Sequence, residues 1–186
     1  MVSLASLWLP IVVAAVAVFL VSSILHMVLK YHRADHKKIP NESEALAGLA
    51  KAALPPGAYM FPFCDSMQEM GTPEGQEKFR RGPVGTIYIL PNGQMSMGKY
   101  LGTWFAYCLL VSAVVACLAC GVLAAGAATT VVFHQIALSA FLAYGLGQVV
   151  NSIWLGVPWA NTFRSLFDGL IYAAVTGGCF AWLWPH

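Results

Sequence analysis

The last apolar stretch of the chain contains a carboxylate, Asp168, one helical turn after Arg164 and one turn before Tyr172. Residues four apart share one face of a helix, so Asp168 is expected to reach back to Arg164. An ionisable side chain inside an apolar helix costs free energy unless it is buried in protein and paired. The spacing therefore predicts a site for a proton, an ion or a polar headgroup, in which Arg164 keeps Asp168 ionised.

Two other apolar stretches contain polar residues with the same spacing. Ser22 and His26 are four apart on the first, and Tyr144 and Gln148 are four apart on the third, with Asn151 beside them. All are expected at one depth, in the cytoplasmic half of a bilayer, and we call them the polar cluster. Its members are Ser22, His26, Tyr144, Gln148, Asn151, Arg164, Asp168 and Tyr172. Such a cluster is either a hydrogen-bond network that fixes helix register or a cytoplasm-facing site whose titrating members are Asp168 and His26.

The composition is that of a membrane protein. Hydrophobic residues make up 59% of the chain, charged residues 10%, and the mean hydropathy is +0.69. Four apolar stretches have about the 20 residues that a spanning helix needs. They run from about Leu7 to Leu29, Leu101 to Ala127, Val131 to Trp154 and Phe163 to Trp184. The first stretch has no preceding basic residue and no cleavage pattern, so we expect a retained anchor.

The basic residues predict the orientation. Nine of the ten lysines and arginines lie in or beside the long connection after the first span, and the tenth, Arg164, lies before the last span. All are then on one side, which the positive-inside rule makes the cytoplasm. Both termini are therefore expected outside, and the basic inner rim, with His32 and His36, is expected to contact the membrane surface.

The long connection carries folding signals of its own. Asn41 with Glu44 forms a capping-box pattern before a short helix, and Thr72 followed by Pro73 begins another that Gly82 ends. The segments "AYMFPF" and "VGTIYIL" are typical of strands, and "PNG" is typical of a turn into "QMSMG". The sequence thus predicts an all-α membrane protein: a bundle of four transmembrane helices with a small cytoplasmic α/β insert between helices 1 and 2. Residues 1–30 form the first helix, 31–100 the cap, and 101–186 a three-helix segment that makes one unit with the first.

Small residues recur every fourth position on two spans and predict close helix packing, because in lipid such faces let helices approach. The same faces could pack against a neighbouring subunit. The positions are Ala113, Cys117, Gly121, Ala125, Gly169, Ala173 and Gly177.

Metal and cofactor patterns are weak. Soft sulfur ligands select copper(I), and a copper site is an alternative prediction, but its methionines lack a tight repeat. The residues are Met60, Cys64, Met67, Met70, Met95 and Met97. His26 and His134 lie toward opposite ends of their helices, too far apart to share a haem. Cys117 and Cys120 lack a partner pair for disulfide exchange, so we expect them to be packing residues and predict no cofactor.

One resemblance covers most of the chain. The segments "GPVGTIYILPNGQMSMGKYLGTWFAYCLLVS" and "LAYGLGQVVNSIWLGVPWANTFRSLFDGLIYAAVTGGCFAWLWP" resemble a group of uncharacterised bacterial four-helix membrane proteins. The resemblance implies the four-helix topology and a bacterial inner membrane. It implies no activity.

These patterns indicate a binding or structural role rather than an enzyme, because no nucleophile with its base, phosphate-binding loop or catalytic carboxylate pair is recognisable. The first hypothesis is an accessory or self-assembling membrane subunit that binds other chains through its small-residue faces and cap. The alternative is a small oligomeric transporter or an ion- or proton-binding protein that uses the polar cluster. The expected partners are the lipid bilayer and either further copies or a larger membrane complex, and not nucleic acid.

Overall fold

A computed structural model describes residues 2–185. The chain is mostly helical, at 70%, with a small two-stranded sheet. It forms two compact units. The first contains the N-terminal residues through His36, Met95–Ser152 and the residues from Val157 on, and the second contains Lys37–Gln94 with Ile153–Gly156.

Three helical segments are long and apolar enough to cross a membrane: Leu4–Val28, Met97–Val122 and Thr129–Leu155. A short 3₁₀ turn, Leu4–Leu7, leads into α1 (Trp8–Ser23), and α5 is Met97–Val122. The last helix, α8 (Trp159–Trp182), is long enough to span but has more polar residues. Ser96 caps α5 by accepting a hydrogen bond from the amide of Lys99, so "QMSMG" begins this helix instead of returning as a strand.

The third predicted span is not one continuous α-helix. α6 (Thr129–Tyr144) ends at Gly145, a 3₁₀ turn covers Leu146–Gln148, and α7 (Val149–Leu155) completes the segment. A Cβ at position 145 would lie 2.6 Å from the ring of Phe141. α6 thus ends at a glycine, a residue with low helix propensity.

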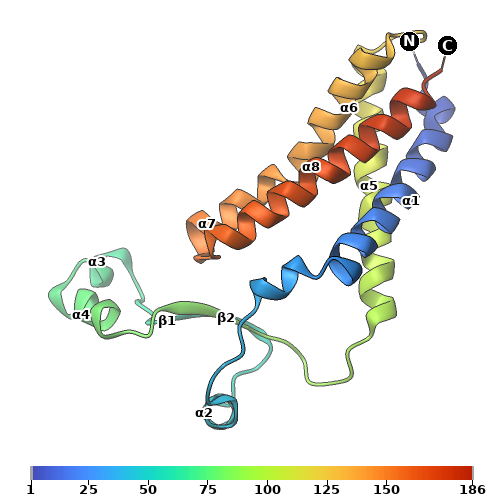
Figure 1. Cartoon of the computed structure of the whole chain (residues 1–186). Coiled ribbons are helices and arrows are strands. Elements are labelled where there is room, and N and C mark those ends of the chain that lie inside the picture. Colours follow the sequence, from blue (N-terminus) through green and yellow to red (C-terminus); the bar gives the residue numbers. More distant parts are fainter. Residues whose placement is uncertain (1, 186) are drawn as a thin grey trace. The chain divides into compact units, whose positions relative to one another are not determined.

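The helices of the first unit pack in pairs. α6 lies along α8 and α1 lies along α5, and α1 also packs on α8 (Figure 1). α1 begins and α8 ends at the same end of the unit (Figure 1). There the indole of Trp184 donates to the carbonyl of Ala124 at 3.0 Å, which ties the end of α8 to the turn after α5. The core between the helices consists largely of alanine and valine, and such small side chains allow close approach.

The second unit has the two helices and two strands that its sequence predicts, and one short helix, α3, that was not predicted. α2 is Glu42–Lys51, α3 is Met67–Met70 and α4 is Pro73–Arg81. Thr72 caps α4 by accepting from the amide of Gly75 at 3.0 Å, and the helix ends at Gly82. β1 (Gly57–Phe61) pairs antiparallel with β2 (Gly85–Ile89). Asn41 is at the N-cap of α2, but its side chain makes no capping hydrogen bond.

Candidate functional site

A reversal of the chain after α1 builds the site. α1 continues into a π-helical turn, Ile24–Val28, which contains His26. Lys30 then adopts a left-handed conformation with φ of 57°, and the next residues form a short 3₁₀ helix, Tyr31–Asp35. A non-glycine residue in this conformation is uncommon and turns the chain sharply. The turn brings Tyr31, His32 and Asp35 against α8.

Asp168 is the centre of the site. Its residue surface is only 3% exposed, and both carboxylate oxygens have partners from the segment after α1. The hydroxyl of Tyr31 donates to Oδ1, and Nε2 of His32 lies 2.7 Å from Oδ2. Hydrogen bonds and an opposite charge make such burial of a carboxylate tolerable. Asp168 is therefore a fully engaged member of a side-chain network.

His32 lies between two carboxylates. Nδ1 of His32 is 2.5 Å from Oδ2 of Asp35, while Nε2 faces Asp168. On its far side Asp35 accepts a hydrogen bond from Arg164 at 2.6 Å. The side chain of Asn161 donates to the carbonyl of Asp35 at 3.0 Å and holds this segment on α8. The result is a row of alternating charges: Arg164, Asp35, His32 and Asp168.

These contacts shift the pKa values of three groups that follow the helical segment Leu4–Val28: His32, Asp35 and Tyr31. Burial lowers the pKa of His32, but the hydrogen bonds that His32 donates to Asp35 and Asp168 outweigh it, so the net pKa is raised. Burial raises the pKa of Asp35, but His32 and Arg164 more than compensate, so the net pKa is lowered. Burial, followed by the hydrogen bond to Asp168, raises the pKa of the Tyr31 hydroxyl. His32 therefore favours its charged form, and Tyr31 stays a donor.

His26 approaches the same oxygen of Asp168, Oδ2, that His32 contacts. Its Nδ1 lies 3.0 Å from the carbonyl oxygen of Ser22, which can only accept, so Nδ1 carries a proton. Nε2 then carries either a second proton or a lone pair, and it lies 3.7 Å from Oδ2 of Asp168. The neutral ring therefore presents a lone pair to a carboxylate, whereas the charged ring presents a donor. The ring also stacks on His32, with centroids 4.3 Å apart and planes at 6°.

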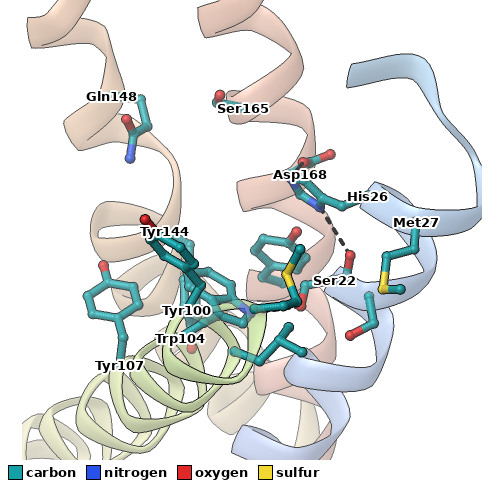
Figure 2. Close-up of a pocket in the computed structure, with 14 residues that line it drawn as sticks. Ser22, His26, Met27, Tyr100, Trp104, Tyr107, Tyr144, Gln148, Ser165 and Asp168 are labelled. Atoms are coloured by element: carbon teal, nitrogen blue, oxygen red, sulfur yellow. Dashed lines mark hydrogen bonds and ion pairs between the residues drawn. The ribbon is translucent and has the colours of Figure 1, made fainter. Parts of the chain in front are cut away.

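A pocket of about 580 Å³ opens beside His26 and Asp168 in the first unit. Four segments surround it: α1 with its π-helical turn, α5, the end of α6, and α8 (Figure 2). The indole of Trp104 on α5 donates to the hydroxyl of Ser22 at 2.8 Å, which fixes one wall. The lining residues are Ser22, Ser23, His26, Met27, Met97, Tyr100, Leu101, Trp104, Tyr107, Tyr144, Gln148, Ser165, Asp168 and Tyr172.

A metal ion fits this arrangement poorly. His26, His32 and Asp168 each offer a ligand atom, and these atoms lie within 4.8 Å of one another. A histidine nitrogen binds a metal at about 2.0–2.1 Å along its lone pair, which lies in the ring plane. The two stacked rings lie in nearly parallel planes, which do not meet at such a point. The geometry suits shared protons better than a metal.

The structure brings most of the polar cluster together. Ser22, His26, Tyr144, Gln148, Asp168 and Tyr172 line the pocket. Asn151 does not, but its amide donates to the side chain of Gln148 at 3.0 Å. The predicted pair of Arg164 with Asp168 is wrong: Arg164 binds Asp35, because the reversal after α1 brings Asp35 beside it and gives Asp168 other partners.

Sequence reasoning missed Tyr31, His32 and Asp35 as site residues. His32 was expected at the membrane surface, but its side chain is only 15% exposed and lies between carboxylates. The available signal was the run of titratable residues directly after the first span, Tyr31, His32 and Asp35, which follows His26 near the end of that span.

The predicted small-residue face of α8 is buried against other helices, whereas that of α5 is largely exposed. On α8, Gly169, Ala173 and Gly177 are buried, and Gly169 and Gly177 lie directly against the α6 segment. On α5, Cys117 and Gly121 are exposed and Ala113 is partly exposed, while the neighbouring Ser112 and Ala116 are buried. Ala125 lies beyond the end of α5. The α5 stripe therefore faces away from the other described helices.

The six residues of the copper alternative belong to different units. Met60, Cys64, Met67 and Met70 lie in the second unit, and Met95 and Met97 in the first. Met60, Met67, Met95 and Met97 are exposed, with Met95 at 78%. Nothing in the geometry of the described residues within either unit gathers them into a site, and copper carries no proposal here.

Comparison of the chain with protein families, with curated proteins and with solved structures gives no match. The site must therefore be interpreted from its own geometry.

Proposed function

We propose that this chain is an integral membrane protein of the bacterial inner membrane that binds an exchangeable proton at the polar cluster. Four spans, with α8 as the fourth, would place both termini outside and the site near the cytoplasmic end. Three apolar helices and the basic connection support this arrangement. α8 is polar mainly where it meets protein, since Thr162, Asp168 and Thr176 are buried.

The observation that carries the proposal is the placement of two stacked histidines on one buried carboxylate. His32 is held charged between Asp168 and Asp35, and the charge of Arg164 offsets that of Asp35. A second proton on His26 would face Asp168 but would place two positive rings 4.3 Å apart. Attraction and repulsion oppose each other at His26, so its proton is the exchangeable one.

The test is histidine protonation measured by NMR in detergent micelles. Long-range ¹⁵N spectra report which ring nitrogen carries a proton, and H26Q and H32Q assign the signals. We expect neutral His26 to be protonated at Nδ1, and we expect Asp168→Asn to lower the pH at which His32 loses its proton. Asp65→Asn makes the same chemical change at an exposed position of the second unit and is the control. A His32 titration unchanged by Asp168→Asn would overturn the proposal.

Self-assembly is a second candidate, and the outward stripe of α5 favours it. Cys117 and Gly121 leave a smooth, exposed face that a second copy could approach closely. Light scattering of the protein in detergent should show a dimer or larger assembly, and Cys117→Leu should reduce it. Monomers for both proteins would contradict self-assembly and leave the proton site untouched.

A further inference from the structure

The charge of the pocket wall selects its ligand. Among the described residues that line the pocket, Asp168 is the one carboxylate, and no lysine or arginine is present. Arg164 is turned away toward Asp35. Asp168 already contacts Tyr31 and His32, but it is the one formal negative charge on this wall, and a negative wall favours a cation over an anion.

Much of the remaining wall is aromatic. Trp104 lies 5.6 Å from Tyr107, 6.3 Å from Tyr144 and 6.0 Å from Tyr172 between ring centroids, and the two buried tyrosines are 5.6 Å apart. Figure 2 shows Trp104, Tyr107 and Tyr144 on the side of the pocket opposite His26 and Asp168. Aromatic faces attract organic cations and also accommodate an apolar body.

Tyr144 and Tyr172 contribute ring surface to this wall. The two residues are 6% and 4% exposed, and their hydroxyl oxygens are buried, without a hydrogen-bond partner among the described residues. On this side an occupant therefore meets aromatic rings, which suit the apolar body of an organic cation.

His26 lies where a bound cation would compete with its proton. Asp168 from α8, and His32 and Tyr31 from the segment after α1, are the titratable groups that face it, and Tyr100 of α5 lines the same pocket. A charged His26 and a bound cation would both use the charge of Asp168. Binding of one therefore opposes binding of the other.

We infer that the pocket binds an amphipathic organic cation, with its charged nitrogen near Asp168 and its apolar part on Trp104 and the tyrosines, in exchange for the proton on Nε2 of His26. The exchange step rests on the proposed proton site. The proton passes to water as the cation enters, so the net charge of the site is unchanged and no bond other than N–H breaks. The ligand is defined by this chemistry, whether it is a free solute or the ammonium headgroup of a lipid.

The experiment is calorimetric titration of the whole protein in dodecyl maltoside with benzyltrimethylammonium, whose charge does not change with pH. We expect binding that tightens with rising pH, by at most about tenfold per pH unit, the limit for exchange of one proton. Titrations in buffers of different ionisation enthalpy should show release of up to one proton. Benzyl alcohol and benzenesulfonate, which are neutral and anionic, should bind at least tenfold more weakly.

Variants locate the site. Asp168→Asn should abolish measurable binding, and Trp104→Leu should weaken it about tenfold through loss of the cation–π contact. Trp154→Leu alters an indole that is 76% exposed and does not line the pocket, so it should leave the affinity unchanged. Equal binding of cation and benzyl alcohol, or equal effects of the two tryptophan changes, would overturn the inference.

Two further comparisons distinguish a lipid ligand from a soluble ligand, and failure of cation binding from failure of the proton site. Added phosphatidylethanolamine should compete with the probe if a lipid headgroup is the ligand, and should not if the ligand is a soluble cation. Absence of cation binding at every pH, together with an intact response of His32 to Asp168→Asn, would reject the cation and retain the proton site. Binding without proton release would reject the exchange.

Discussion

The contact between α8 and α6 offers a sharp test of how the site is held, through the change Gly169→Ala. Gly169 follows Asp168 directly, and a Cβ at this position would lie 2.5 Å from Cα and 2.8 Å from the amide nitrogen of Gly145. Both are backbone atoms and cannot rotate away. The two helices would have to separate.

The size of the effect follows from these distances. Ordinary contacts begin near 3.4 Å, so the backbones must move apart by about 0.9 Å beside the carboxylate that His32 contacts at 2.7 Å. Overpacking of this kind costs about 1–3 kcal/mol, and the better helix propensity of alanine returns less than about 1 kcal/mol. We expect a net loss of about 1–2 kcal/mol and a loosened contact between His32 and Asp168.

Thermal unfolding in detergent, followed by helical circular dichroism, measures this loss. Gly178→Ala is the matched control, because Gly178 lies on the same helix and a Cβ there would meet no atom within 4 Å beyond its chain neighbours and the adjacent backbone of α8. It should be neutral or slightly stabilising. Equal stability of the two variants would refute the close packing of α8 on the end of α6, and with it the geometry that positions Asp168.

Three further changes test separate parts of the chain. The pKa of His32 is raised in the folded protein, so the stabilisation from its charge is fully present below pH 6.5 and is lost as the pH rises through the higher folded pKa. The unfolding temperature should fall across that pH range, and it should fall less in H32Q. Tyr172→Phe removes a buried hydroxyl without a partner among the described residues and should change the free energy of unfolding by less than about 0.5 kcal/mol. Tyr31→Phe removes a hydrogen-bond donor to the carboxylate of Asp168 and should cost about 1.5–3 kcal/mol in the same assay. Thr72→Ala removes the cap that binds the amide of Gly75 and should cost about 1 kcal/mol, measured as faster hydrogen exchange across α4.

Much of the secondary structure was predictable, because its signals are local. The cap at Thr72 and the stop at Gly82 mark the ends of α4, and runs rich in β-branched and aromatic residues mark β1 and β2. The three helices that are long and apolar enough to cross a membrane follow from length and composition alone. The break after Tyr144 was missed, because an isolated glycine such as Gly145 is tolerated inside many long helices and does not by itself predict an end.

The site was predictable only where its residues share a helix. Spacing of four identified Ser22 with His26 and Tyr144 with Gln148, and these residues line one pocket. Helical spacing predicted Asp168 as the partner of Arg164, but the chain reversal after α1 brings Asp35 to 2.6 Å from Arg164. That turn is made by Lys30, a residue type with no preference for the left-handed conformation, so nothing local in the sequence announces it.

The reversal after α1 also explains how the buried carboxylate of Asp168 can belong to a site that exchanges a proton or a cation. A carboxylate buried alone in an apolar helix would carry the full desolvation cost of its charge. Tyr31 and His32 instead satisfy both oxygens from a segment outside the spans, and Asp35 with Arg164 balances the charge of His32. The pocket side of Asp168 is left to His26. His26 is thus the member of the network that can hold a proton or give way to another cation, while the contacts of Tyr31, His32 and Asp35 stay in place.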